Sequence, residues 1–304
     1  MSVLDTGVNL YRKTFKRVRI VHVAAHRLMT HGVIPLLERV TGLRTMPDDP
    51  LWFRFELLLK RHEPETVAQI QRLVKPGMNV LDIGAHVGYY ARMLGTLTGD
   101  GGRVYAFEPH PRTYKMLCAN IAALNNVTPV NAAVAEQEGT AELFDYLMMS
   151  ASGSLHFDES MRDLQKAQLG SGDIAPRIEH DFPVEKFTVR TLALDDFLAE
   201  KGVTHIDFIK MDIEGAEIGA LRGLRRTIAQ SPGLQLIMEY NPQALKAFGH
   251  DPAAAFDEVL ALGFTRAQIV HEDGTLSDVQ RDALAALTGQ LMQNMGVVNV
   301  LLTR

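Results

Sequence analysis

In residues 205–221, HIDFIKMDIEGAEIGAL, an apolar run ends at Lys210, and the three carboxylates of Asp212, Glu214 and Glu217 follow it. Lys210 and Asp212 are two residues apart, so their side chains share a face if the run is a strand. A carboxylate in this position can orient a hydroxyl group, or take its proton while the oxygen attacks an electrophile. An alcohol has a very high pKa, so proton removal must accompany the attack. We therefore predict Asp212 and Lys210 as catalytic residues.

The other acids near Asp212 divide between structural and binding roles. Glu217 falls in the first turn of a predicted helix, where a carboxylate stabilises the helix dipole. Glu214 lies between strand and helix, and Glu239 and Asn241 end the next strand, MEYNP. We predict substrate contacts for Glu214, Glu239 and Asn241. The alternative is that Asp212, Glu239 and Asn241 bind a divalent ion such as Mg²⁺, which prefers oxygen ligands; we favour the metal-free set.

A glycine-rich turn stands at residues 80–91, VLDIGAHVGYYA. Gly84 lets the chain turn at the end of a strand, and Gly88 lets a ligand approach the backbone at a helix N-terminus. Glu108 ends the following strand, where an acid can accept hydrogen bonds from both ribose hydroxyls of a nucleotide cofactor. Nicotinamide dinucleotides and S-adenosylmethionine (SAM) are the two candidates.

The spacing of the turn decides between these cofactors. The dinucleotide fingerprint G-x-G-x-x-G needs glycine at positions 84, 86 and 89. This chain has His86 and Tyr89 instead. The segment DIGAHVG resembles the D-x-G-x-x-x-G motif of class I SAM-dependent methyltransferases.

Longer stretches resemble the FkbM family of methyltransferases. The similarity covers residues 55–270 and includes NVLDIGAHVGYYA, VYAFEPHPRTYKMLCANIAALN, HIDFIKMDIEGAEIGALRGL and IMEYNP. This resemblance implies SAM-dependent methyl transfer to a hydroxyl oxygen of a sugar, a glycolipid or a polyketide-type natural product. One position departs from the pattern, because the family usually has Asn where this chain has His86. His86 is a second candidate base, and the alternative is that it only covers the cofactor.

The resemblance also implies the cofactor contacts. They fall on Asp82, Gly84, Ala85, His86, Gly88, Glu108, His110, Asn131, Ala133 and Asp212. Glu63 and Glu65 match a further family feature near the cofactor or substrate, or are simply acids at a helix N-terminus. A glycine- and serine-rich loop at residues 148–155 suggests a lid over the acceptor, with Ser154 as a substrate contact.

The elements that must position these residues alternate along the chain. Strands are expected at residues 79–84, 102–109, 127–135, 206–211 and 233–242, and helices at 89–99, 112–125, 194–202, 216–228 and 251–263. This order predicts a doubly wound, mostly parallel, Rossmann-like α/β sheet. Strand-like segments at 265–273 and 296–304 predict an antiparallel C-terminal edge. Residues 136–190 form an excursion from the pattern.

The whole chain has 304 residues, a formal net charge of −5 and a single cysteine. Neither nucleic-acid binding nor a disulfide framework is expected. No secretory signal is evident, so we expect a cytoplasmic protein. We divide the chain into an N-terminal helical extension, 1–60, and a methyltransferase domain, 61–304.

Residues 1–44 are basic, with eight Lys and Arg against two acidic residues. We favour a helix packed on the main domain with a solvated basic face. The alternatives are contact with an anionic membrane or glycolipid and a homodimer arm.

Two other functions compete with methyl transfer. The first is a nicotinamide-dependent oxidoreductase, which His86 and Tyr89 disfavour. The second is a catalytically inactive methyltransferase fold that serves as a binding protein. That hypothesis predicts damage to the glycine turn or to Glu108, and both are intact.

Overall fold

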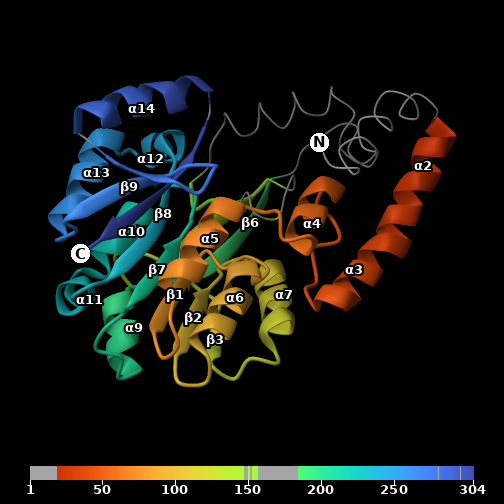
Figure 1. Ribbon diagram of the computed structural model, residues 1–304, viewed down its shortest axis with the longest axis horizontal. Helices are drawn as coiled ribbons and strands as arrows, with labels where there is room; N and C mark the ends of the chain where they lie inside the picture. Colours follow the sequence, from red (N-terminus) through yellow and green to blue (C-terminus); the bar gives the residue numbers. More distant parts are fainter. Residues whose placement is uncertain (1–18, 147–149, 151–152, 157–183, 280, 295) are drawn as a thin grey trace.

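The computed structural model describes residues 19–146, 150, 153–156, 184–279, 281–294 and 296–304. A sheet of eight strands runs through its centre in the order β10-β9-β11-β8-β7-β1-β2-β3 (Figure 1). Helices cover both faces of this sheet, as the alternation of strands and helices predicts.

Five neighbouring strands are parallel. They are β1 (Asn79–Ile83), β2 (Arg103–Phe107), β3 (Val127–Val130), β7 (Phe208–Met211) and β8 (Gln235–Tyr240). The chain passes from β1 outward to β2 and β3, then returns to the other side of β1 as β7. The order therefore reverses between β1 and β7, where doubly wound sheets bind ligands. Asp82 of β1 lies opposite Lys210 of β7 in the register.

The antiparallel edge is confirmed and contains three strands. They are β9 (Arg266–Val270), β10 (Leu276–Asp278) and β11 (Val298–Thr303). The C-terminal strand β11 lies between β8 and β9 and runs antiparallel to both, so β10 forms the outer edge.

Alternating side chains divide the core between the two faces of the sheet. Val80 packs on one face with α5 (Pro64–Leu73), α6 (Tyr89–Thr98) and α7 (Pro111–Ile121). Leu81 and Ile83 pack on the other face. That face is covered by α9 (Leu194–Glu200), α10 (Glu217–Arg222), α11 (Arg225–Gln230), α12 (Pro242–Ala247), α13 (Pro252–Ala261) and α14 (Arg281–Asn294). Asp82 shares the face of Val80, because strand side chains alternate.

The strand predicted at residues 127–135 is wrong in its extent, because the chain turns after Val130. There Ala132 N donates a hydrogen bond to Val130 O. The next residues form β4 (Ala133–Val134), which joins β5 (Gly139–Asp145) and β6 (Glu185–Leu192) in a separate three-stranded sheet. The excursion thus contributes two long strands that pair with each other. Residues 157–183 of the excursion lie outside the described residues.

The helix predicted at residues 216–228 is two helices, α10 and α11. Gly223 separates them and lies against another segment of backbone, since a Cβ there would be 2.3 Å from Ala135 O. The helix predicted at 251–263 is confirmed as α13. Asp251 caps it by accepting a hydrogen bond from Ala254 N at 2.9 Å, and Gly263 follows its end.

The N-terminal helices form an arm beside the sheet (Figure 1). They are α2 (Arg19–Leu28), the π-helical turn η1 (Met29–Val33), α3 (Ile34–Thr41) and α4 (Leu51–Leu58). Ile34, Phe53 and Leu57 share a buried cluster with Val87 of the glycine turn, which fixes the arm to the domain. No helix in the described part of the chain is long and apolar enough to cross a membrane.

Candidate active site

The turn after β1 needs both of its predicted glycines. Gly84 has φ +85°, and a Cβ there would lie 1.9 Å from Asp212 O. Gly88 has φ +89°, and a Cβ there would lie 2.8 Å from Leu117 Cδ1. Ala85 between them is buried, and its N–H donates to Phe107 O at 2.9 Å. The turn is thereby held against β2, β7 and α7.

Glu108 ties this turn to the end of β2. Its Oε2 accepts a hydrogen bond from His86 N at 2.9 Å, and its Oε1 accepts from His110 N at 2.9 Å and Thr113 Oγ1 at 2.8 Å. Burial raises the pKa of Glu108, although these hydrogen bonds act in the opposite direction. A carboxylate has about four acceptor positions, so Oε2 can accept one more donor from a ligand.

Asp82 is a fully buried carboxyl group without a hydrogen bond of normal geometry from any described residue. Burial raises its pKa to about 7, and the charges of Asp212 and Glu108 act in the same direction, against Lys210. A buried carboxylate with no donor is unstable as an anion. Asp82 is therefore suited to a cationic ligand group.

Lys210 and Asp212 form a charge pair at the end of β7. Lys210 Nζ donates to Asp212 Oδ2 at 2.8 Å and lies 4.8 Å from the centroid of the Tyr90 ring. Burial works to lower the pKa of Lys210, but Asp212 and Glu63 outweigh it and raise that pKa. Burial works to raise the pKa of Asp212, yet Lys210 lowers it overall. Both groups are therefore charged at neutral pH.

Two further acids surround Asp212. Asp212, Glu214 and Glu239 each offer a carboxylate oxygen, and these oxygens lie within 4.8 Å of one another. Burial, reinforced by the charge of Asp212, raises the pKa of Glu214 to about 8 and raises that of Glu239 well above its ordinary value. The structure thus brings Glu214 and Glu239 to Asp212, as the sequence predicts.

Glu217 serves the backbone beside this cluster. Its Oε1 accepts hydrogen bonds from Ile213 N at 3.3 Å and Gly215 N at 3.2 Å. Burial raises its pKa to about 7. It holds the turn between β7 and α10, which agrees with the structural role predicted for it.

Three predicted site residues have structural partners. Asn241 caps α12, because its Oδ1 accepts from Ala244 N at 3.0 Å. Asn131 Nδ2 donates to Glu108 O at 2.9 Å and Pro109 O at 3.0 Å, and so holds the end of β2. Ala133 lies in the core of the small sheet.

His110 and Ser154 join the site to the small sheet and the excursion. His110 Nε2 lies 3.1 Å from Asp145 Oδ2, and its ring meets Phe187 edge to face at 4.6 Å. Ser154 Oγ lies 3.5 Å from Glu214 O. The loop predicted as a lid falls mostly outside the described residues.

His86 is the partly buried histidine of the turn. Burial lowers its pKa to about 3, and nearby His62 adds to the effect, so the ring is neutral. Its Nε2 lies 2.5 Å from Ser150 Oγ, and its ring centroid lies 6.0 Å from that of Phe53. Sequence reasoning did not identify Ser150.

Glu63 has a definite place in the site. It stands at φ +42° at the N-terminus of α5, and its Oε2 accepts from Tyr90 Oη at 2.8 Å and Asn299 Nδ2 at 3.2 Å. It thereby joins α5, α6 and β11 close to Lys210. The sequence signal for it was the match of Glu63 and Glu65 to a feature of the FkbM family.

The parallel sheet, its switch point beside β1, the D-x-G-x-x-x-G turn and the acid ending β2 together define a class I SAM-dependent methyltransferase. The profile of the Methyltransferase FkbM domain matches residues 82–265. The chain therefore belongs to the FkbM family and is a SAM-dependent O-methyltransferase.

Comparison with individual proteins finds two related methyltransferases and one solved structure. The chain is similar to the 31-O-demethyl-FK506 methyltransferase FkbM of Streptomyces tacrolimicus, with 28% identity over 204 residues, 63% of this chain and 74% of that protein. It is similar to the 2-O-methyltransferase NoeI of Sinorhizobium fredii, with 27% identity over 182 residues, 58% of this chain and 68% of that protein. A SAM-dependent methyltransferase structure from Aquifex aeolicus aligns with a TM-score of 0.42 and 15% identity, covering 89% and 97% of the two chains.

Proposed function

We propose that this enzyme methylates a hydroxyl of a sugar, glycolipid or polyketide-type acceptor, and that Asp212 directs that hydroxyl. The main observation behind this proposal is that Lys210 and Asp212 form an ion pair at the switch point of the sheet. SAM supplies an electrophilic methyl group on a sulfonium when it is bound. Asp212 accepts the hydrogen bond of the acceptor hydroxyl and takes its proton as the carbon–oxygen bond forms.

The residues around the turn fit SAM. Asp82 offers a buried carboxylate that receives no hydrogen bond of normal geometry from the described residues, which suits the cationic part of this cofactor. Glu108 Oε2 has an acceptor position left for a ribose hydroxyl. Gly84 and Gly88 keep the backbone free of side chains. We propose these four residues, with Ala85 and His110 beside them, as the cofactor contacts, and we also assign Asn131 and Ala133 to the adenine end.

Lys210 keeps Asp212 ionised and holds one of its two carboxylate oxygens. Because Lys210 Nζ binds Oδ2, the other carboxylate oxygen of Asp212 can receive the acceptor. Glu214 and Glu239 have raised pKa values, so they can donate hydrogen bonds to further acceptor oxygens near neutral pH. Ser154 Oγ lies 3.5 Å from Glu214 O, and we propose Ser154 and Asn241 as further acceptor contacts.

We propose that this acid cluster works without a metal ion. Burial raises the pKa of Glu214 and of Glu239, and a protonated acid does not add to the repulsion that a divalent ion would otherwise offset. Turnover should then be the same with EDTA and with added Mg²⁺. Loss of turnover in EDTA, with recovery in Mg²⁺, would assign the three carboxylates to a metal instead.

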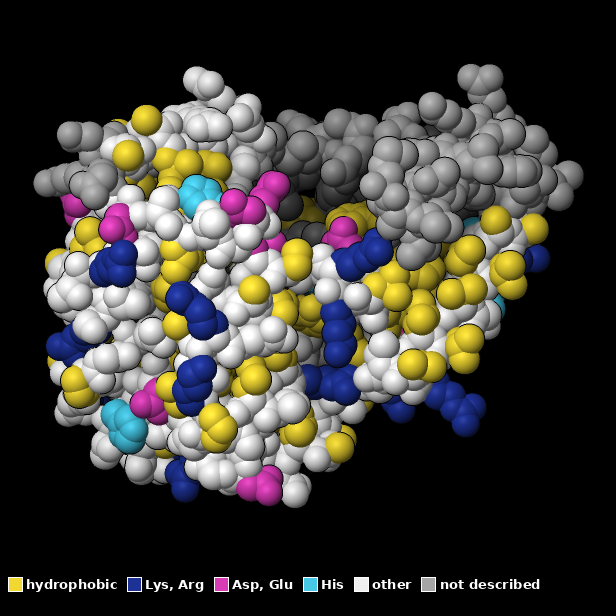
Figure 2. All heavy atoms as spheres, viewed as in Figure 1, with side chains coloured by type: hydrophobic (Ala, Val, Ile, Leu, Met, Phe, Trp, Pro, Cys, Tyr) yellow, Lys and Arg dark blue, Asp and Glu magenta, His cyan; other side chains and the backbone are white. Residues whose placement is uncertain are grey.

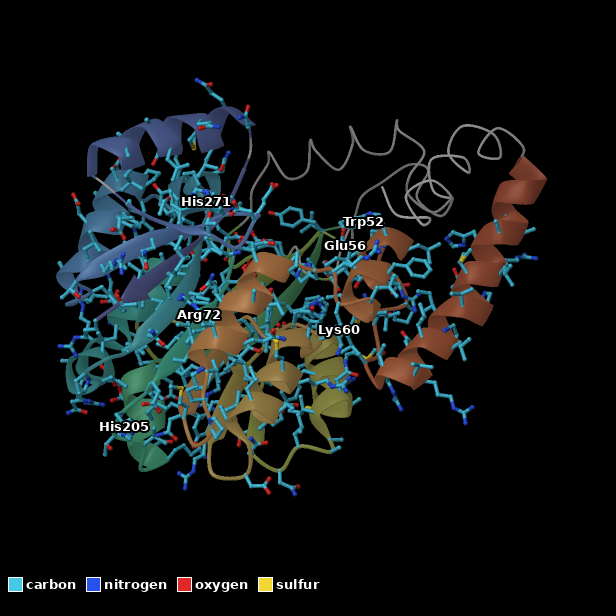
Figure 3. All side chains as sticks on the ribbon, in the orientation of Figure 1. Trp52, Glu56, Lys60, Arg72, His205 and His271 are labelled. Atoms are coloured by element: carbon cyan, nitrogen blue, oxygen red, sulfur yellow. The ribbon has the colours of Figure 1, made fainter. Side chains whose placement is uncertain are left out.

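The acceptor class is supported by an exposed aromatic ring near the site. Trp52 is 55% exposed and lies on α4 beside Glu56, with Lys60 beyond the other end of this helix (Figure 3). Its ring meets Phe53 at 5.7 Å, and Phe53 in turn lies beside His86. An indole face suits the apolar face of a sugar ring. Trp52→Ala should raise the KM for a sugar acceptor and leave SAM affinity unchanged.

The proposed function is tested by incubating the enzyme and SAM with candidate acceptors. Mass spectrometry detects methyl transfer as the mass gain of one methyl group on the acceptor. Asp212→Asn should lower kcat by about 10²–10⁴-fold while SAM affinity stays within about threefold of that of the wild type. An equal loss of both would make Asp212 a cofactor residue.

We further propose that residues 1–60 are an extension whose arm contacts an anionic membrane surface carrying the acceptor. Leu28, Leu36 and Val40 are 63%, 62% and 75% exposed, and Figure 2 shows hydrophobic side chains gathered on the arm. Arg27 and Arg39 are exposed among them. The protein should co-sediment with vesicles containing phosphatidylserine more than with neutral vesicles. A stable homodimer in solution, disrupted by Leu36→Glu, would assign the arm to dimerisation.

A further inference from the structure

Three residues far apart in the sequence form a hydrogen-bonded chain at the glycine turn. Asp49 is 6% exposed and lies between α3 and α4. Its Oδ1 accepts from Ser150 N at 2.7 Å, and its Oδ2 accepts from Ser150 Oγ at 2.7 Å. Ser150 Oγ in turn lies 2.5 Å from His86 Nε2. The arm, the excursion and the cofactor turn therefore meet at one hydroxyl group.

The chemistry of these groups fixes the direction of the hydrogen bonds. A carboxylate only accepts, so Ser150 gives its single hydroxyl hydrogen to Asp49. Ser150 Oγ must then accept from His86, which places the hydrogen of the neutral imidazole on Nε2. The lone pair of His86 therefore lies on Nδ1. No hydrogen bond from another described residue reaches Nδ1.

Both the backbone and the ring of His86 are held in place by neighbouring residues. Its backbone has φ +50°, and its N–H donates to Glu108 Oε2 at 2.9 Å. Phe53 packs beside the ring. With Ser150 on Nε2, the position of Nδ1 is determined by the protein before any ligand arrives.

We propose that Asp49 and Ser150 are positioning residues that hold His86 in its Nε2–H tautomer, so that Nδ1 accepts a hydrogen bond from a second hydroxyl of the acceptor. The proposal rests on the function given above, and it makes the preferred acceptor one with at least two neighbouring hydroxyls, as a sugar has. The proton released in methyl transfer goes to Asp212, while His86 only binds.

The electrostatic surroundings agree with a binding role. Burial lowers the pKa of His86 to about 3, so its Nδ1 lone pair stays available near neutral pH. The titratable or charged groups that act on the ring are His62, Asp212, Lys210 and His110, with Asp49 and Glu108 linked through hydrogen bonds. Lys210 keeps Asp212 ionised, and we assign the released proton to Asp212 rather than to His86.

The tautomer can be measured without knowing the acceptor. We would label the full-length protein with ¹⁵N-histidine, record long-range ¹H–¹⁵N spectra between pH 6 and 8, and assign His86 from the signals lost in His86→Asn. The wild type should show a neutral Nε2–H ring throughout. Ser150→Ala and Asp49→Asn should give a mixture of tautomers, and Ser150→Thr should restore the Nε2–H form.

Two results would overturn the proposal: a His86 ring protonated on Nδ1 in the wild type, or a ring unchanged in both Ser150→Ala and Asp49→Asn. Circular dichroism and SAM binding control for folding, and SAM affinity should stay within about threefold of wild type. Once an acceptor has been identified, Ser150→Ala should raise the KM for that acceptor by about tenfold, which is the effect of losing one hydrogen bond. The kcat should be nearly unchanged. If no candidate acceptor is methylated, the proposed function is wrong, but the result on the His86 tautomer remains valid.

Discussion

Lys210 and Asp212 share a hydrogen bond of 2.8 Å at the end of β7, with the lysine side chain buried and the aspartate side chain 27% exposed. The same lysine lies opposite Asp82 on β1. One cation therefore offsets the charges of several acids. Its removal should affect stability and chemistry together.

Lys210→Met should lower the free energy of unfolding by about 3–5 kcal/mol, because it leaves buried carboxylates without a cation. Asp212→Asn should cost less, and the double variant should be more stable than the sum of the single effects predicts, by about 1–3 kcal/mol. Urea unfolding measures all three. Strictly additive effects would mean that the two side chains do not interact.

Gly84→Ala should destabilise the protein strongly and abolish SAM binding. A Cβ at this position would meet Asp212 O at 1.9 Å, and the backbone has φ +85°. Gly77→Ala is a matched control, since Gly77 has φ +86° with nothing within 4 Å of its Cβ position. It should cost about 1–2 kcal/mol from the backbone alone and leave SAM binding intact. Equal losses in thermal unfolding would show that the contact with Asp212 is unimportant.

Glu214→Gln should stabilise the protein at high pH only. The pKa of Glu214 rises from 4.5 to about 8 on folding, so its contribution to stability is full below pH 4.5 and is lost as pH rises through about 8. Gln carries no proton to lose. The melting temperature of the variant should exceed that of wild type by a few degrees at pH 9 and not at pH 4.5. A shift of the same size at both pH values, or in the exposed control Glu138→Gln, would contradict this reasoning.

Asp82 should lose its proton when SAM binds. Its pKa is raised to about 7 by burial, and a bound cation would lower that pKa. At pH 7, binding should therefore release about half a proton from this group, and affinity should increase from pH 6 to 8. Calorimetry in two buffers of different protonation enthalpy measures the release. Asp82→Asn should bind SAM more weakly, and its proton release should be smaller; an unchanged release would exclude Asp82 as the source.

The parts of the site that depend on local backbone could be predicted from the sequence. Gly84 and Gly88 occupy positive-φ positions in a strand–turn–helix unit, and Glu108 ends the next strand. Asp212 likewise comes directly after the last residue of a strand, β7. Each of these residues is positioned by the element that precedes it, so spacing was sufficient.

Contacts between distant segments could not be predicted in this way. Ser150 meets residues 64 and 101 positions away, His86 and Asp49, and no periodic pattern marks it. The split of the strand at 127–135 depends on pairing with β6, which is more than 50 residues later. By contrast, Asn241 stands directly before Pro242 at a helix start, so its capping role could have been predicted from its position.

Equilibrium dialysis with tritiated SAM tests the central claim most directly. The wild-type protein should bind one SAM per chain, Glu108→Ala should weaken binding by at least about tenfold, and the surface variant Glu138→Ala should bind like wild type. Absence of binding by the wild type, or equal binding by the wild type and Glu108→Ala, would contradict the assignment of the SAM site to the switch point of the sheet beside β1 and β7.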